Sequence, residues 1–255
     1  MTIPAGLRNS SQPSVPGRLI SVFAFLLLCA MALYYFLHSP VFGVREVIIE
    51  GNECLRSEEV VQLTGVILGT NIFLIDEEQI KRRLQIHPLL DTATIERRLP
   101  DKLWVRIQER TPFALIPVPE GGFMAIDPQG VYLTRVGNIV EINRPVITGC
   151  AIPSDILPGQ PLSVSILAQF LPIMEQTSPA VQLAISEINL SQPENIRIYT
   201  LNGIEIRVGT LEHLSEYLGV LEEILTVQIN RFEYRTVEYI DMSFRGSPVI
   251  KFYSE

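Results

Sequence analysis

The chain has 255 residues, a formal net charge of −8 at pH 7 and a pI near 5.0. It has no basic stripe to neutralise phosphates, which argues against a nucleic-acid-binding protein. Its three cysteines form no Cys-x-x-Cys pair, so a zinc or thioredoxin-type site has no support. The length suits an anchor followed by two small domains.

The first feature along the chain is an uncharged, nearly all-apolar run from Leu19 to Leu37. As a helix it would be roughly 28 Å long at about 1.5 Å per residue, close to the hydrocarbon thickness of a bilayer. We therefore expect a transmembrane helix over residues 19–38. A cleaved signal peptide is the alternative, but the run is longer than a signal core. Tyr34 and Tyr35 also suit a membrane–water interface.

The residues before this run predict its orientation. Arg8 and Arg18 precede it, and no acidic residue does. Positive charge beside a first span usually stays in the cytoplasm. We expect a short cytoplasmic tail over residues 1–18 and extracytoplasmic domains after the span, with the protein in the cytoplasmic (inner) membrane.

Residues 42–111 predict a small domain in the order β-α-α-β-β. The second of its last two strands alternates Leu103, Val105 and Ile107 with Trp104, Arg106 and Gln108, the period of a sheet buried on one face. The predicted elements are a strand at Val44–Glu50, a helix with Ser57 as N-cap, a helix from Asp76 that stops before Pro88, and strands at Asp91–Leu99 and Leu103–Arg110.

From residue 112 the sequence pattern changes to short apolar stretches interrupted by proline and glycine. This pattern predicts a second domain over 112–255, a mixed and mostly antiparallel β domain with two helices, so that the whole chain is of the α+β class. The helices are expected at Val164–Gln176 and Leu211–Ile229, and the closing strands at Val237–Met242 and Val249–Tyr253.

A search for chemistry finds no constellation of reactive residues. The three histidines have no partner at metal-ligand or triad spacing, and nothing in the sequence joins Cys150 to His87 as nucleophile and base. Gly65 to Gly69 lacks the lysine of a phosphate loop. We therefore predict no catalytic, cofactor or metal site. Cys54 and Cys150 are expected to be free thiols.

Motifs across both domains resemble the FtsQ/DivIB family of bacterial cell-division proteins, whose first domain is a POTRA domain. The second domain shares Ala125-Ile126-Asp127 with Gly130 and the closing run Tyr239 to Phe244, while residues 135–184 carry no signature. Two positions depart from the family, Leu89 for a common tryptophan and Ser243 for a common arginine. The motifs of the first domain are Val44-x-x-Val47-x-Ile49-x-Gly51-Asn52, Gly69-x-Asn71-Ile72-Phe73, Ile86-His87-Pro88-Leu89-Leu90 and Glu109-Arg110-x-Pro112.

The resemblance implies a non-enzymatic scaffold of the division septum. It would bind the single-pass proteins FtsB (DivIC in other bacteria) and FtsL and help control septal peptidoglycan synthesis together with the septal synthase. An alternative is a POTRA-bearing component of a polypeptide export or envelope assembly system. An extracytoplasmic enzyme would need a cleft around Cys150 or His213.

The closing strand, Asp241–Phe252, is the candidate partner-binding site. A last strand tends to lie at a sheet edge, where unpaired N–H and C=O groups accept an incoming strand. We expect truncation after Tyr239, or a proline at Val249 or Ile250, to abolish partner recruitment. For Arg97, Arg98, Glu109 and Arg110, structural roles at strand ends and partner contacts both stay open. The candidate residues are Asp241, Met242, Ser243, Phe244, Val249, Ile250 and Phe252.

Overall fold

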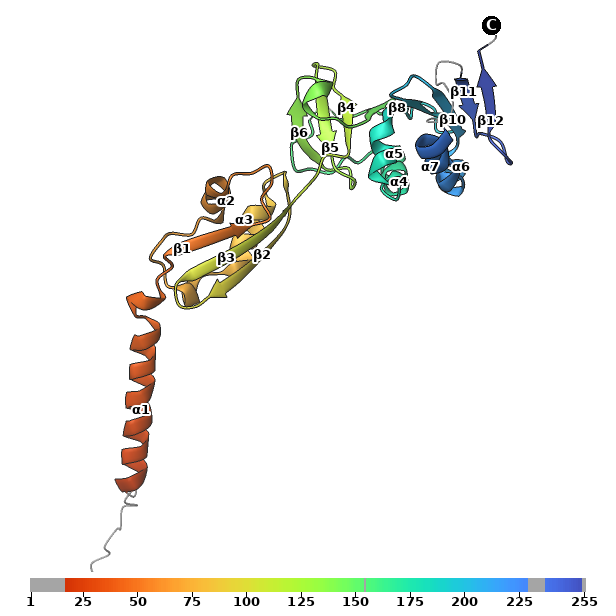
Figure 1. The fold of residues 1–255 in the computed structure, drawn as a ribbon. Coiled ribbons are helices and arrows are strands. Elements are labelled where there is room, and N and C mark those ends of the chain that lie inside the picture. Colours follow the sequence, from red (N-terminus) through yellow and green to blue (C-terminus); the bar gives the residue numbers. More distant parts are fainter. Residues whose placement is uncertain (1–16, 154, 229–236, 254–255) are drawn as a thin grey trace, which may run out of the picture.

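The computed structural model describes residues 17–153, 155–228 and 237–253, which form an N-terminal helix and two domains (Figure 1). Nearly all of the expected cytoplasmic tail, residues 1–18, lies outside the described residues, as does the end of the expected helix at Ile229. The domains follow one another along the chain, with the first next to the helix. The architecture is α+β, as the sequence predicts.

Helix α1 spans Gly17–Leu37 and projects away from the first domain, which it meets only at its C-terminal end (Figure 1). Its segment Arg18–Leu37 reaches a mean hydropathy of 2.4, and none of it is buried within the protein. A helix with apolar side chains on every face is stable only in an apolar surrounding. α1 is therefore long and apolar enough to cross a membrane.

The first domain is a three-stranded sheet with two helices, in the predicted order β-α-α-β-β. β3 is the central strand, parallel to β1 and antiparallel to β2. Leu103, Val105 and Ile107 are buried under the helices, which confirms the alternation seen in the sequence. The elements are β1 (Glu46–Glu50), α2 (Ser57–Thr64), α3 (Glu77–Gln85), β2 (Leu90–Arg98) and β3 (Lys102–Glu109).

The helix starts follow from local hydrogen bonding. Asp76 caps α3 as expected, since its carboxylate accepts a bond from the Gln79 N–H at 3.0 Å. The prediction of Ser57 as the N-cap of α2 is wrong by one residue. The cap is Arg56, whose side chain makes no capping bond but whose carbonyl accepts from the N–H of Val60 at 3.1 Å.

The second domain contains a nine-stranded sheet in the order β12-β11-β10-β9-β8-β7-β4-β5-β6. The neighbours β4–β7, β7–β8 and β10–β11 are parallel, and the other described pairs are antiparallel, which confirms a mixed, mostly antiparallel sheet. The strands are β4 (Ala114–Pro117), β5 (Phe123–Ile126), β6 (Tyr132–Val136), β7 (Val146–Thr148), β8 (Ile185–Asn189), β9 (Ile196–Thr200), β10 (Glu205–Gly209), β11 (Val237–Asp241) and β12 (Val249–Phe252).

Helices lie on one side of strands β8 to β11 (Figure 1). Phe170, Leu214 and Leu221 from three of them share a core with inward residues of the strands, such as Ile198 and Ile206. The opposite side of these strands carries no described helix. The helices are α4 (Ser165–Met174), α5 (Pro179–Ala184), α6 (Leu211–Glu216) and α7 (Leu218–Glu223), and a π-helical turn, Ile224–Gln228, follows α7.

The structure differs from the expectation of two helices in this domain. α5 was missed, although Ser178-Pro179 is a helix-start pattern that presets the first turn. The long helix expected at 211–229 is interrupted at Tyr217, whose backbone (φ −103°, ψ 19°) is not helical. Gly219 lowers the helix propensity at this point.

Arg110 joins the two domains. Its guanidinium lies 2.8 Å from the Asp91 carboxylate of the first domain and 2.5 Å from the Asp127 carboxylate of the second. Asp127 is only 1% exposed, and its other oxygen accepts the Val131 N–H at 2.8 Å. The two domains also approach each other at Gly159, where an added Cβ would lie 3.7 Å from the Pro88 ring. The junction is therefore built from specific contacts rather than from a loose linker.

Candidate functional site

β12 is the end strand of the large sheet. β11 is hydrogen-bonded on both sides, parallel to β10 and antiparallel to β12, with Ile240 opposite Ile250 and Asp241 opposite Val249. The outer edge of the sheet therefore belongs to β12, and the first half of the candidate span is interior to the sheet or forms the connection.

The seven candidate residues fall into three environments. Met242 is 3% exposed and lies in the core, so it supports the fold and offers no contact surface. Ile250 also packs against that core. The Asp241 carboxylate accepts bonds from Ser243 N at 2.9 Å and Ser243 Oγ at 2.6 Å, which fixes the start of the β11–β12 connection. The exposed apolar side chains are Phe244, Val249 and Phe252.

A polar cluster beside this edge was missed by sequence reasoning. The Arg207 guanidinium lies 3.7 Å from the Tyr239 ring centroid, and Lys251 Nζ lies 5.3 Å from it. Lys251 pairs with Glu238 at 3.0 Å, and this hydrogen-bonded carboxylate raises the pKa of the lysine. Arg207 pairs with Glu205 at 3.3 Å. In the sequence, these polar residues are visible only as the residues that alternate with Ile206 and Ile240. They form a cluster because β10, β11 and β12 lie side by side in the sheet.

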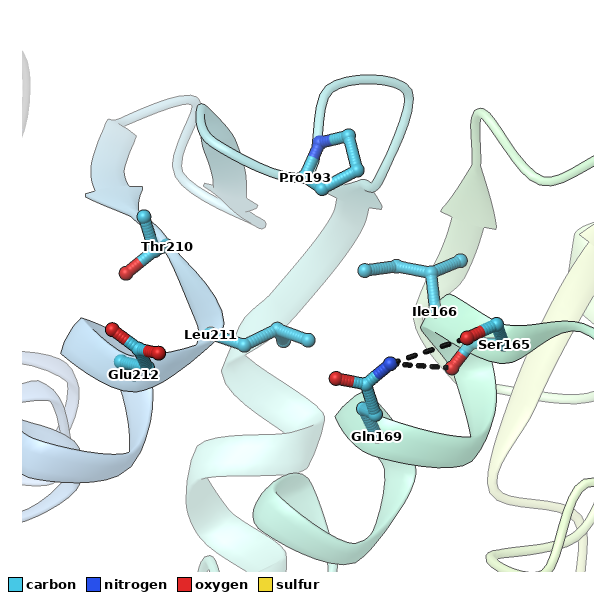
Figure 2. A pocket seen from close by; sticks show the side chains of 7 residues that line it. All are labelled: Ser165, Ile166, Gln169, Pro193, Thr210, Leu211 and Glu212. Carbon is cyan, nitrogen blue, oxygen red and sulfur yellow. Dashed lines mark hydrogen bonds between the residues drawn. The ribbon is translucent and has the colours of Figure 1, made fainter.

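A cavity between two helix starts of the second domain holds no catalytic arrangement. It has a volume of about 400 Å³ and lies between the start of α4 and the start of α6 (Figure 2). The Gln169 amide donates to the carbonyl and hydroxyl oxygens of Ser165, both at 3.2 Å, and Thr210 caps α6. Glu212 is the one ionisable group among its lining residues. No nucleophile faces a base in this cavity.

Cys150 and His213 lie outside the 400 Å³ cavity and the 320 Å³ cavity beside α5. Burial raises the pKa of the Cys150 thiol to about 11, so it stays protonated near neutral pH and is a poor nucleophile. All three cysteines are free, and the described residues contain no group of three metal ligands.

The charged residues at the strand ends of the first domain have structural partners. Glu109 accepts the N–H groups of residues 53–55 at 2.8–3.0 Å. Its burial disfavours ionisation, but these three bonds outweigh that effect and lower the pKa of the carboxyl. Arg97 donates to the Ile75 carbonyl and pairs with Glu77, while Arg98 lies 3.1 Å from the Trp104 ring centroid.

Comparison with known proteins agrees with this two-domain division. Residues 42–110 match the family described as "POTRA domain, FtsQ-type", and residues 114–243 match "Cell division protein FtsQ/DivIB, C-terminal". The second match alone covers more than half of the chain. The chain belongs to the FtsQ/DivIB family.

Curated members of the FtsQ/DivIB family match over most of their length. The cell division protein FtsQ of Syntrophotalea carbinolica is 28% identical over 218 residues, which cover 84% of this chain and 75% of the relative. DivIB of Clostridium tetani is 25% identical over 236 residues, which cover 89% and 86%. This FtsQ/DivIB chain therefore has a role in cell division.

Among solved structures, the major extracytoplasmic domain of DivIB from Geobacillus stearothermophilus matches with 16% identity and a TM-score of 0.33. The match covers 48% of this chain and 97% of that domain. The family assignment comes from the sequence matches and does not depend on this superposition.

The two departures from the FtsQ/DivIB pattern have visible consequences. Leu89 is half-buried and packs against the core of the first domain, so it fills the place of the common tryptophan. Ser243, where an arginine is common, donates its hydroxyl to Asp241 within the same connection. The side chain at position 243 is therefore uncharged and is hydrogen-bonded within this connection.

Proposed function

We propose that this FtsQ/DivIB protein is a non-enzymatic scaffold that binds FtsB/DivIC-like and FtsL-like single-pass division proteins through the outer edge of β12. Through them it would position the septal peptidoglycan synthase. The observation that carries this proposal is that β12 is the end strand of the nine-stranded sheet. The family's cell-division role supplies the context.

The edge has the two features that strand addition needs. Alternate residues of an edge strand direct their N–H and C=O groups away from the sheet, where an incoming strand pairs with them. Exposed apolar side chains add affinity, and Val249 (56% exposed) and Phe252 (45% exposed) provide them. Lys251 lies between them and would favour an acidic side chain on the partner strand.

We propose that the protein carries out no catalytic chemistry. Among the described residues, burial keeps the Cys150 thiol protonated, and the 400 Å³ cavity lacks a nucleophile–base pair. A protein of this kind acts through affinity and position alone.

The proposed placement is a single pass through the cytoplasmic membrane at the division septum. Arg8 and Arg18 precede the span, which favours an inner N-terminus and extracytoplasmic domains. The proposed boundaries are a tail at 1–18, a span at 19–38, a POTRA domain at 42–111 and a β domain at 112–255. A functional fluorescent fusion should form a midcell band in dividing cells, and an even distribution around the envelope would contradict this placement.

Binding to the purified FtsB/DivIC-like protein of the same organism tests the edge. The full chain in detergent carries Val249→Ser together with Phe252→Ser. The exposed part of the phenylalanine ring is about 90 Å² of a roughly 200 Å² side chain, and burying it at about 25 cal/mol per Å² contributes about 2 kcal/mol, or roughly 30-fold in Kd. We expect at least this loss.

The control is Val140→Ser, which removes an apolar side chain that is 90% exposed and lies outside β12. Circular dichroism checks that each variant is folded. Truncation after Tyr239 is less informative than expected from the sequence, because it also deletes the core residues Ile240 and Met242. Ending the chain after Ser247 removes β12 and keeps them. Unchanged affinity in this truncated chain would refute the edge as the binding site.

A further inference from the structure

We propose that the loop between α2 and α3, residues 66–75, lies in the headgroup layer of the membrane that α1 crosses and inserts its apolar side chains there. This loop is called the apolar loop below. The inference requires α1 to span the membrane. It does not depend on which side the domains occupy or on partner binding at β12.

The apolar loop exposes large hydrophobic side chains that the protein does not cover. Ile67 is 76% exposed, Leu68 63% and Leu74 68%, and Val41 nearby is 50% exposed. No residue from 65 to 75 is charged. The surface of a soluble protein rarely carries such a group of apolar side chains unless they bind something.

The loop is fastened to the end of the membrane helix. The Asn71 amide donates to the carbonyl of Leu37, the last residue of α1, at 2.6 Å. The Phe42 ring contacts Phe36 of α1 on one side and Phe73 of the loop on the other, with centroid separations of 5.2 and 5.1 Å. The Phe73 ring therefore lies within about 10 Å of a ring on the span itself.

These distances place the loop at headgroup depth. The 21 residues of α1 are about 31 Å long, which fills a hydrocarbon core of about 30 Å and brings Leu37 to its boundary. The headgroup layer adds roughly 5–7 Å on each side. Tyr34 and His38, whose rings lie 4.1 Å apart, mark the same level with polar aromatic groups.

Several backbone groups of the apolar loop are already hydrogen-bonded within the protein, which suits a poorly hydrated layer. The Gly69 N–H donates to the Val44 carbonyl at 2.8 Å, and the Val44 N–H donates to the Thr70 carbonyl at 2.9 Å. The Thr70 N–H donates to the Ile67 carbonyl at 3.1 Å. Because these groups are paired, inserting the side chains does not leave these particular peptide groups without a hydrogen bond. Continuity with the span and the lack of charge favour the bilayer over a protein as the occupant.

Lipid-borne quenching tests this placement in the full chain. The native cysteines are replaced (Cys29→Ser, Cys54→Ser and Cys150→Ala), and Leu68→Cys carries an environment-sensitive nitrobenzoxadiazole label. The protein is reconstituted into phosphatidylcholine vesicles whose acyl chains are brominated at shallow carbons. We expect a blue-shifted emission and at least about threefold greater fractional quenching than for the same label at Val140→Cys. Leu74→Cys serves as a second labelled site, and Trp104 fluorescence checks the fold of each variant.

Two results would overturn the proposal. One is labels at positions 68 and 74 that are as water-exposed as the label at 140. The other is a label that becomes shielded only after a purified division protein is added, which would assign the loop to a protein partner. Equal quenching in vesicles with and without anionic phosphatidylglycerol is expected, because apolar insertion and not charge holds the loop.

Discussion

Replacing Arg110 with methionine should destabilise the second domain far more than an ordinary surface substitution. The guanidinium is the cationic partner of Asp127, whose side chain is 1% exposed. Without it, a buried carboxylate is left with only the Val131 N–H, and breaking such a pair from one side costs about 3–5 kcal/mol. Arg110 is itself 19% exposed, so we take about 3 kcal/mol as the expected loss.

Urea unfolding of the full chain in detergent measures this loss. Far-UV circular dichroism follows both domains, and Trp104, the single tryptophan, reports on the first domain alone. The circular-dichroism transition should move to lower urea more than the fluorescence transition does. A double variant with Asp127→Asn should recover about 1–2 kcal/mol, because it removes the stranded charge.

The control for this prediction is Arg45→Met. Arg45 pairs with Asp101 at 3.5 Å, but its side chain is 72% exposed, so the change should cost less than about 0.5 kcal/mol. If Arg110→Met costs no more than Arg45→Met, or if the double variant is less stable than Arg110→Met alone, the reasoning about a buried charge at the domain junction is refuted.

Three further predictions concern single sites. Because the pKa of Glu109 is lower in the folded than in the unfolded chain, its stabilising effect should be present above about pH 4.5 and be lost as pH falls through the folded pKa; Glu109→Gln should therefore flatten the acid limb of a stability-versus-pH curve, and an unchanged limb would contradict this. At pH 8, iodoacetamide should modify exposed Cys54 well before Cys150, whose pKa is about 11, and mass spectrometry showing the reverse order would refute the burial argument. Gly51→Ala should destabilise the first domain by more than about 1 kcal/mol in thermal unfolding, since its φ is +85° and a Cβ there would lie 2.1 Å from the Ile107 carbonyl oxygen; a neutral effect would contradict this geometry.

The elements that the sequence predicts well are those with a strong local signal. The alternation through Leu103, Val105 and Ile107 and the cap at Asp76 depend only on neighbouring residues, and both are confirmed. The interruption of the helix at Tyr217 was missed because the apolar residues keep a helical spacing across it. Periodicity alone therefore predicts one continuous helix. Helix α5 was missed because it is too short for its apolar residues to show a helical period.

The candidate site shows where local reasoning stops. The closing strands were located within a residue or two, but their pairing partners are distant in sequence. Which strand is the edge, that Met242 is in the core, and that Arg207 stacks on Tyr239 all depend on the parallel pairing of β10 with β11. No pattern within β11 or β12 encodes that pairing. Arg110 appeared as part of a motif, and its role became visible only once Asp91 and Asp127 were placed on either side of it.

The width of the nine-stranded sheet determines how far a partner would have to extend from the membrane to contact β12. Eight steps of about 4.8 Å between neighbouring strands put β12 roughly 38 Å across the sheet from β6. In Figure 1, β12 lies at the opposite end of the molecule from α1. If β12 binds a partner tethered in the same bilayer, as proposed, that partner's binding segment must stand on a stalk, and a helical stalk that spans the sheet's width would have about 25 residues. On this proposal, a partner whose stalk is too short could not reach β12 whatever its side chains.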